Sequence, residues 1–244
     1  MIFIRTLLFN IVFFSFSFVM SILLLPLLVL PRRKLYKTLN TLYFRIVKHF
    51  EYVLIGLKYK IEGLENLPKE GGYIVASKHQ SAYETLKYPI LLDEAAIIMK
   101  KELMQIPFWG WYPARAGHIG VDRGTRERAV KSITEGAKRV LLDEKRPLLI
   151  FPEGTRTKPG QKDVRYKRGI SHIYEAVNVP VVPIALNSGA FWGKNSFWKR
   201  PGTVTFRILP PIPPGLTDDE FRARLKAAIE DNSTELLKDV GFNV

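Results

Sequence analysis

The sequence contains no cysteine, and this absence excludes disulfide bonds, thiolate metal sites, iron–sulfur clusters and a cysteine nucleophile. Histidine is scarce as well: no H-E-x-x-H motif is present, and the only histidines are His49, His79, His118 and His172. The sequence also lacks the G-x-x-x-x-G-K-[ST] phosphate-binding loop, the G-x-G-x-x-G dinucleotide motif and the G-x-S-x-G nucleophile elbow. We therefore expect no metal site, and a nucleotide kinase, a dinucleotide enzyme and a common serine hydrolase are disfavoured.

Acidic residues are few relative to basic ones: 23 Asp and Glu stand against 37 Lys and Arg in 244 residues, a net charge of +14. The excess is uneven, because residues 1–60 hold nine Lys and Arg and a single acid, Glu51. That quarter of the chain is also the most apolar. A segment that is both apolar and basic favours an anionic membrane surface over nucleic acid as its partner. The length and the 47% hydrophobic content favour one globular domain with an appendage.

An uncharged run occupies positions 7–30 and is broken only by four polar residues and Pro26. About 20 apolar residues span the hydrocarbon core of a bilayer, so the run predicts a membrane helix, which we place at 6–30. No small-residue cleavage site follows it, which argues against a signal peptide. The cluster Arg32-Arg33-Lys34 predicts attachment to the cytoplasmic face of the cell (inner) membrane. Pro26 leaves open whether the helix crosses the bilayer or dips into one leaflet.

Residues 35–57 predict a second, amphipathic helix. Apolar residues recur every three or four positions, and the polar residues, Glu51 among them, lie mostly elsewhere around the helix. Two placements of the apolar stripe are open: against a domain core, or among lipid headgroups. We expect a membrane anchor over residues 1–57 and a separate domain over residues 58–244.

Short β-rich runs alternate with helical patterns after residue 57. Strands are predicted at 58–61, 73–77, 96–99, 118–121, 148–151, 181–186 and 204–208. Helices are predicted at 83–92, 126–142 and 217–238. The last helix begins with a capping box formed by Thr217 and Glu220. This order of elements predicts an α/β fold with a mixed central sheet flanked by helices.

A histidine and an acid follow the predicted strand at 73–77. His79 and Glu84 are five residues apart, so they would lie on different sides of a single helix. They can meet if His79 lies in the loop and Glu84 lies in the first helical turn. The carboxylate would then orient the imidazole and leave its other nitrogen free as a general base. The alternative is a loop histidine beside an acid that is favourable at a helix start for electrostatic reasons alone.

Two further polar clusters stand at the ends of predicted strands. Phe151-Pro152-Glu153-Gly154-Thr155-Arg156 ends one strand, and Gly120-Val121-Asp122-Arg123 ends another. Loops at strand ends are where α/β proteins commonly build their sites. Glycine lets a backbone approach a ligand, and arginine offers a planar fork suited to phosphate. Each cluster alone can also be explained as a charged turn with an internal ion pair, but three such clusters in order favour a site.

With these clusters in place, the chain resembles the 1-acylglycerol-3-phosphate acyltransferases, within the wider glycerophospholipid acyltransferase superfamily. The resemblance covers approximately residues 60–210, and a histidine, four residues and an acid form its first motif. The matching blocks, in order, are His79 with Glu84, Lys100 through Asp122-Arg123, Glu153-Gly154-Thr155-Arg156, and Val182-Pro183-Ile184-Ala185.

Two residues depart from the family motif. The acid is usually Asp, whereas this chain has Glu84, and the residue before the histidine is commonly Asn, whereas this chain has Lys78. Glutamate can still orient an imidazole, so the catalytic assignment stands. The changed motif indicates a subgroup, and it leaves open an acceptor other than lysophosphatidate, such as lyso-ornithine lipid.

The resemblance implies transfer of a fatty acyl group from acyl-CoA or acyl carrier protein to the free sn-2 hydroxyl of 1-acylglycerol-3-phosphate, which gives phosphatidic acid. It implies catalytic roles for His79 and Glu84, and it implies no metal or redox cofactor. Arg123 and Arg156 would hold the acceptor's phosphate, while Glu153 would orient an arginine or the acceptor's hydroxyl. The full set of implied substrate-binding residues is Lys100, Arg123, Glu153, Gly154, Thr155 and Arg156.

An alternative of another class is a basic, membrane-bound module that binds lipid or nucleic acid without catalysis. The positive charge permits it, but the charge is concentrated beside the apolar segment and no recognised nucleic-acid motif is present. We therefore expect a membrane lipid acceptor, a thioester donor and an anionic membrane surface as partners, and no nucleic acid.

Overall fold

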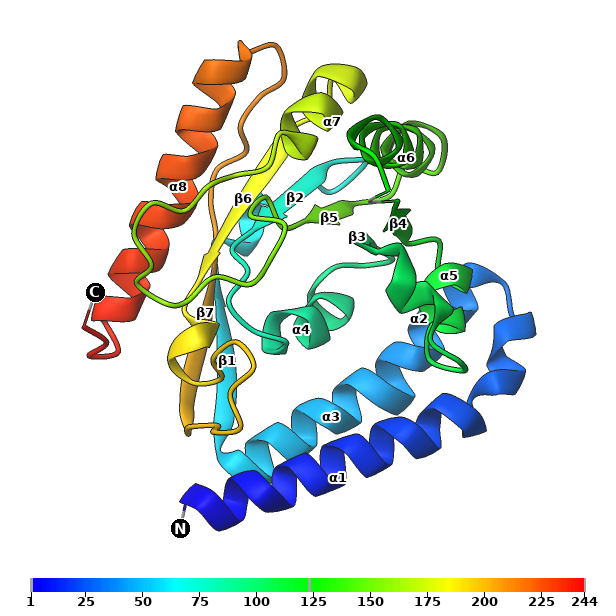
Figure 1. Ribbon diagram of the computed structural model, residues 1–244, viewed down its shortest axis with the longest axis vertical. Coiled ribbons are helices and arrows are strands. Elements are labelled where there is room, and N and C mark those ends of the chain that lie inside the picture. The colour runs from blue at the N-terminus through cyan, green and yellow to red at the C-terminus, as the bar shows by residue number, and fades with distance from the viewer. Residues whose placement is uncertain (1, 123, 244) are drawn as a thin grey trace.

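A seven-stranded sheet runs through the centre of the computed structural model, which describes residues 2–122 and 124–243 (Figure 1). The strands are β1 (Leu57–Glu62), β2 (Ile74–Ser77), β3 (Ala96–Lys100), β4 (Ile119–Val121), β5 (Leu148–Ile150), β6 (Val181–Leu186) and β7 (Gly202–Ile208). Their order across the sheet is β1-β7-β6-β2-β5-β3-β4. β6 and β7 pair antiparallel and the other neighbours pair parallel, so the predicted α/β class with a mixed sheet is confirmed.

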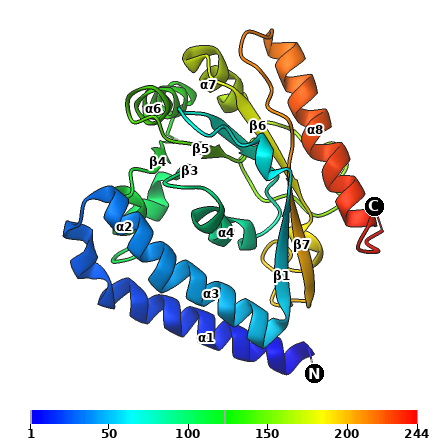
Figure 2. The ribbon, with the colours of Figure 1, turned by 180° about the vertical axis from the view of Figure 1, so that it is seen from behind.

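Helices cover both faces of the sheet (Figures 1 and 2). On one face lie α6 (Arg126–Lys138), α7 (Gly169–Val177) and α8 (Asp218–Lys238), and on the other lie α4 (Tyr83–Leu91) and the N-terminal helices. The alternation of side chains along a strand produces two cores. In β2, Ile74 and Ala76 join the core under α6, α7 and α8, while Val75 joins the core under α4.

The N-terminal segment folds back on itself as a helical hairpin. Its helices are α1 (Ile2–Leu23), α2 (Arg32–Leu39) and α3 (Arg45–Phe50), with a 3₁₀ turn at Leu25–Val29 between α1 and α2. Pro26 lies at the start of this turn, where a missing N–H costs little. The predicted helix at 6–30 therefore ends earlier, at Leu23. By length and composition alone, α1 is able to cross a membrane, and it lies beside α3 along the outside of the molecule (Figures 1 and 2).

The second arm of the hairpin corrects one expectation from the sequence. Two π-helical turns, Asn40–Phe44 and Glu51–Ile55, widen this arm and rotate later positions away from a 3.6-residue repeat. Glu51, expected on the polar face, is fully buried in an ion pair with Lys87 of α4, whereas Val53 of the expected apolar stripe is exposed. Burial raises the pKa of Glu51 and lowers the pKa of Lys87, and the opposite charge of the partner counteracts both shifts.

The remaining elements follow the sequence pattern closely. Each predicted strand and helix in residues 58–244 is present, and its ends lie within a few residues of the predicted ends. The capping box of α8 is confirmed: the Thr217 side chain accepts from the backbone N–H of Glu220, and the Glu220 carboxylate accepts from the backbone N–H of Thr217. Two helices, α5 (Trp111–Arg115) and α7, were not predicted.

Candidate active site

Three parallel strands bring the candidate site together. β2 lies between β6 and β5, and all three run in the same direction, so their carboxyl ends meet at one edge of the sheet. The chain after β2 supplies His79, the chain after β5 supplies residues 151–156, and the chain after β6 supplies Ser188. The first two polar clusters predicted from the sequence therefore lie against each other.

His79 and Glu84 meet as predicted. The Nδ1 atom of His79 lies 2.8 Å from Oε1 of Glu84, which is fully buried in the first turn of α4. The same oxygen accepts from the backbone N–H groups of Gln80 and Ser81 at 2.7 Å each, and the Ser188 hydroxyl donates to the other oxygen at 2.7 Å. A carboxylate held in this way accepts the Nδ1 proton and leaves Nε2 of the neutral imidazole as the free base.

The backbone and the ring of His79 are also held in place. The backbone N–H donates to Oε1 of Glu153 at 3.1 Å, and the carbonyl accepts from both the N–H and the hydroxyl of Thr157 at 2.8 and 3.1 Å. The imidazole stacks on the Phe151 ring, with centroids 3.9 Å apart. These contacts restrict the imidazole to one orientation, which is what a general base requires.

A cavity of about 990 Å³ lies beside His79, between the sheet and the helical hairpin. This volume is at the upper end of the range for small-molecule sites, and its lining is largely apolar. The hairpin contributes Ser17, Met20, Leu24 and Tyr43 to the wall. The cavity therefore fits a ligand that has a long apolar part.

The polar part of the cavity is cationic. No acidic side chain among the described residues lines it, whereas the basic lining residues are Lys100, Arg156, Lys167, Arg168 and Lys194. Of the predicted substrate-binding residues, Lys100, Gly154, Thr155 and Arg156 line the cavity. The third predicted cluster ends β4, two strands away from β5, and Arg123 lies outside the described residues. The electrostatics of this wall suit an anionic group.

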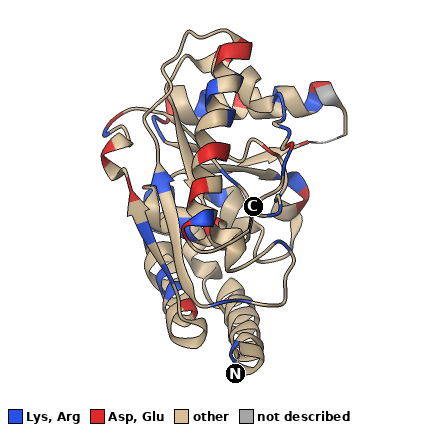
Figure 3. Cartoon of the chain, turned by 90° about the vertical axis from the view of Figure 1, so that its left-hand side faces the viewer, with Lys and Arg blue, Asp and Glu red and all other residues tan. Residues whose placement is uncertain are grey.

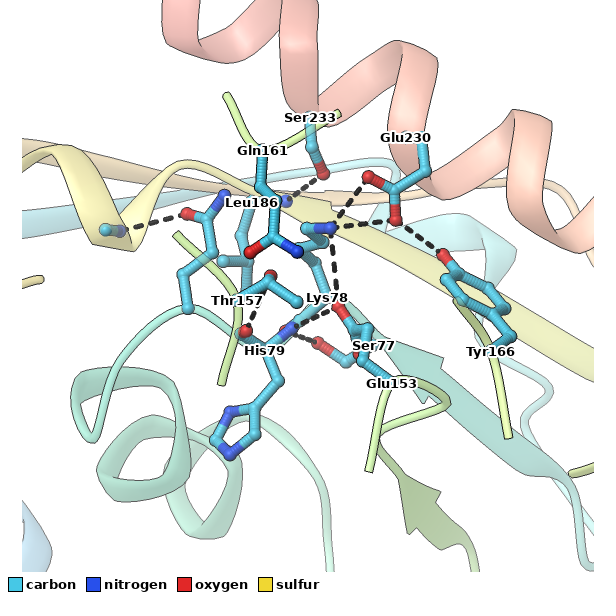
Figure 4. Close-up of polar contacts among 12 residues, drawn as sticks. Ser77, Lys78, His79, Glu153, Thr157, Gln161, Tyr166, Leu186, Glu230 and Ser233 are labelled. Atoms are coloured by element: carbon cyan, nitrogen blue, oxygen red, sulfur yellow. Dashed lines mark hydrogen bonds and ion pairs between the residues drawn. The ribbon is translucent and has the colours of Figure 1, made fainter. Parts of the chain in front are cut away.

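Glu153 does not occupy the place that we expected. Instead of facing an arginine or the cavity, its carboxylate is buried behind His79, where it accepts from the His79 backbone and lies 3.4 Å from the Lys78 ammonium (Figure 4). Burial raises the pKa of Glu153 to about 7, and Lys78 counteracts that rise. The expectation was wrong because a side chain that follows a strand, such as Glu153, can turn toward the interior as well as toward the cavity.

Several residues of the site were not found from the sequence. Ser188 follows β6 at the same sheet edge, so the strand-end argument applied to β6 would have found it. Thr157 and Glu230 give no such signal. Thr157, which donates to the His79 carbonyl, lies in an irregular loop. Glu230, whose carboxylate pairs with the Lys78 ammonium, lies on α8, far along the chain from Lys78.

The fold and the site define a class of protein. An imidazole oriented by a buried carboxylate, beside an apolar cavity with a cationic wall, is equipped for group transfer to or from an anionic amphiphile by general-base catalysis. The sequence model of the acyltransferase family matches residues 58–187, more than half of the chain. The chain belongs to this acyltransferase family, and the resemblance drawn from the motifs is confirmed.

Curated relatives agree with this assignment, and a solved structure shares the fold. The 1-acyl-sn-glycerol-3-phosphate acyltransferase of Pseudomonas aeruginosa is 34% identical over 212 residues, which cover 86% of this chain and 80% of that protein. The protein of the same name from Saccharomyces cerevisiae is 30% identical over 204 residues, covering 82% and 66%. The crystal structure of the 1-acyl-sn-glycerophosphate acyltransferase from Thermotoga maritima shares the fold, with a TM-score of 0.78, 23% identity and coverage of 97% and 98%.

Proposed function

We propose that the chain transfers a fatty acyl group from an acyl thioester to the free sn-2 hydroxyl of 1-acylglycerol-3-phosphate and so forms phosphatidic acid. The observation that carries this function is the His79–Glu84 pair beside an apolar cavity with a cationic wall. The names of relatives that are 30% and 34% identical over most of this chain support the same reaction.

In the proposed reaction His79 first accepts a proton from the acceptor hydroxyl and later donates it to the leaving sulfur. Nε2 takes the proton of the acceptor hydroxyl while the hydroxyl oxygen attacks the thioester carbonyl carbon, and Glu84 stabilises the imidazolium that results. The tetrahedral intermediate then collapses as its carbon–sulfur bond breaks. The sulfur leaves with the proton returned by His79, so the products are an ester and a thiol. The acyl group passes directly to the acceptor, without an acyl-enzyme.

The cationic wall of the cavity is proposed to hold the acceptor's phosphate. Arg156 and Lys100 both line the cavity, which supports their proposed role, and Arg123 joins them in the proposal. Gly154 lets the backbone turn at this point: its φ of +66° lies in the left-handed region, and an added Cβ would lie 3.0 Å from Cγ of Lys167. Thr155 completes the loop that faces the phosphate.

The hairpin is proposed to hold the enzyme in the membrane and to place the cavity at the lipid. α1 is almost free of charged residues and carries only Arg5 (Figure 3). It exposes a row of apolar side chains, among which Phe14 and Phe18 are 66% and 64% exposed. The opposite side of α1 packs on the folded domain, where Phe9 is fully buried and Thr6 contacts the carbonyl of Lys199. A helix fixed along the domain in this way supports insertion into one leaflet.

The basic cluster that follows the hairpin turn supports attachment to the cytoplasmic face of the membrane. The thioester donor is acyl-CoA or acyl carrier protein, because a positive surface suits both the phosphates of the former and the acidic surface of the latter.

A panel of acceptors tests the proposed substrate. The full-length protein, purified in detergent, is offered acyl-CoA or acyl carrier protein with lysophosphatidate, and in parallel with lyso-ornithine lipid, which has no phosphate. We expect a product with the mass of phosphatidic acid and turnover of lysophosphatidate alone. Turnover of lyso-ornithine lipid alone would overturn the proposed acceptor.

A further inference from the structure

A buried lysine lies directly behind the active-site histidine. The Lys78 side chain is 3% exposed, and its ammonium lies 2.7 and 2.8 Å from the two carboxylate oxygens of Glu230 on α8. It also lies 3.4 Å from Oε1 of Glu153, whose side chain is 1% exposed. The Tyr166 hydroxyl donates to Glu230 at 2.9 Å and completes the network (Figure 4).

Burying such a charged network is unfavourable in free energy, so its presence indicates a role beyond stability. Lys78 and Glu153 are both buried, and transferring these two charged groups out of water carries a large desolvation penalty, whereas the Glu230 side chain keeps 20% of its surface exposed. Apolar side chains of similar volume often stabilise a core as well or better. These facts point to a role for the charge itself.

The network reaches the active site through a single oxygen atom. Oε1 of Glu153 accepts the backbone N–H of His79, and the same oxygen faces the Lys78 ammonium. The imidazole of His79 points away from the network (Figure 4), and Lys78 is not among the residues that line the cavity. The contact that links the Lys78 ammonium to the active site is therefore the Glu153 carboxylate, which holds the His79 backbone.

We propose that Lys78 is a positioning residue for acyl transfer: its ammonium, fixed by Glu230 of α8, holds the Glu153 carboxylate against the backbone N–H of His79. The C-terminal helix α8 lies beyond residues 58–187, which match the family, and it thereby becomes part of the support for the active site. This inference rests on the proposed function, because acyl transfer is its readout.

The charge balance gives the proposal a pH signature. The titratable groups around Glu153 are Lys78, His79, Tyr88, Tyr166 and Glu230. Burial raises the pKa of Glu153 to about 7, and the Lys78 ammonium is foremost among the groups that lower it. Without the ammonium the pKa of Glu153 would rise further, so a larger fraction of the carboxyl group would be protonated at neutral pH and would accept the His79 N–H less strongly.

Three variants and one control isolate this effect. Lys78→Met removes the cation, Glu230→Gln removes its counterion, and the double variant removes both. Glu235→Gln is the control, since it removes a more exposed carboxylate that pairs with Arg207 one turn further along α8. The measurements are kcat and KM for acyl transfer to lysophosphatidate between about pH 5 and 9, with thermal unfolding of each variant in detergent as a check on folding.

We expect Lys78→Met to lower kcat at pH 7 by at least about tenfold, with KM changed by less than about threefold and with recovery as the pH approaches 9. The pH at which kcat falls on the acid side should be highest in Lys78→Met, lower in the double variant, lower again in the wild type, and lowest or unchanged in Glu230→Gln. Coulomb's law sets this order, because Lys78 favours the ionised Glu153 and Glu230 opposes it. The control should match the wild type.

The proposal would be overturned if Lys78→Met kept the kcat of the wild type and its kcat fell at the same pH on the acid side. A loss of kcat that does not recover at high pH would also overturn it. If Lys78→Met does not fold, the double variant is compared with Glu230→Gln, and identical kcat and pH profiles for these two would overturn it equally. Failure of the proposed function is a separate result, because the wild type itself would then show no turnover of lysophosphatidate.

Discussion

Replacing Glu84 by glutamine should remove most of the catalytic rate while leaving the fold intact. The amide oxygen of Glu84→Gln can still accept from the backbone N–H groups of Gln80 and Ser81, which now donate to Oε1 at 2.7 Å. The Ser188 hydroxyl can rotate to accept from the amide nitrogen that replaces Oε2. The geometry is therefore retained, and what is lost is the negative charge 2.8 Å from Nδ1 of His79.

The size of the loss follows from that distance. An imidazolium forms in the transition state, and a carboxylate placed 3–4 Å from its charge contributes about 4–5 kcal/mol at an effective dielectric constant of about 20. At about 1.4 kcal/mol for each factor of ten, kcat should fall by about 10³-fold. Glu84→Asp keeps the charge but shortens the side chain by one methylene, so we expect an intermediate loss of about tenfold.

Initial rates of acyl transfer to lysophosphatidate in detergent measure both effects, with thermal unfolding as a check on folding. Glu70→Gln, which changes an exposed loop acid, serves as the matched control and should keep the wild-type rate. A folded Glu84→Gln variant with a kcat within about threefold of the wild type would refute the reasoning, because the charge would then have no part in the transition state.

Three further predictions concern the acceptor, the membrane and the core. Arg156→Ala should raise KM for lysophosphatidate by about tenfold or more, and KM for the thioester much less, because a charge-assisted contact to phosphate is lost; equal effects on both substrates would contradict a phosphate contact. Phe14→Ser with Phe18→Ser should lower turnover on vesicles by about tenfold or more and leave turnover of a soluble short-chain acceptor unchanged, because only membrane insertion loses apolar area; equal losses in the two assays would argue against insertion. Lys87→Met should lower the free energy of unfolding by about 3–5 kcal/mol, because it leaves the buried Glu51 carboxylate without its partner, and adding Glu51→Gln to the same chain should restore part of the loss. Denaturant unfolding measures both variants, and a Lys87→Met variant as stable as the wild type would contradict the pairing.

The central sheet and most of the site were accessible from the sequence because they depend on short-range signals. Short β-rich runs predict the strands, and residues directly after parallel strands must gather at one edge of the sheet. His79 and Glu84 were found in this way, since five residues separate a loop end from a first helical turn.

The errors arise where long-range packing decides the outcome. The π-helical turns of the hairpin shift the helical period, so Glu51 entered the core against its pattern. Glu153 turned inward because Lys78 and the His79 backbone offer it partners there, and Glu230 supplies the countercharge from a helix far along the chain. A linear sequence does not state which distant charges become neighbours.

The central claim is that His79 is the general base of acyl transfer to lysophosphatidate, and kcat of His79→Ala tests it most directly. The full-length wild type and the variant are assayed side by side in detergent and on vesicles, with binding to vesicles measured for both. We predict phosphatidic acid from the wild type, a kcat lower by about 10³-fold or more in the variant, and equal vesicle binding. A folded, membrane-bound His79→Ala variant with a kcat within about tenfold of the wild type would contradict the account.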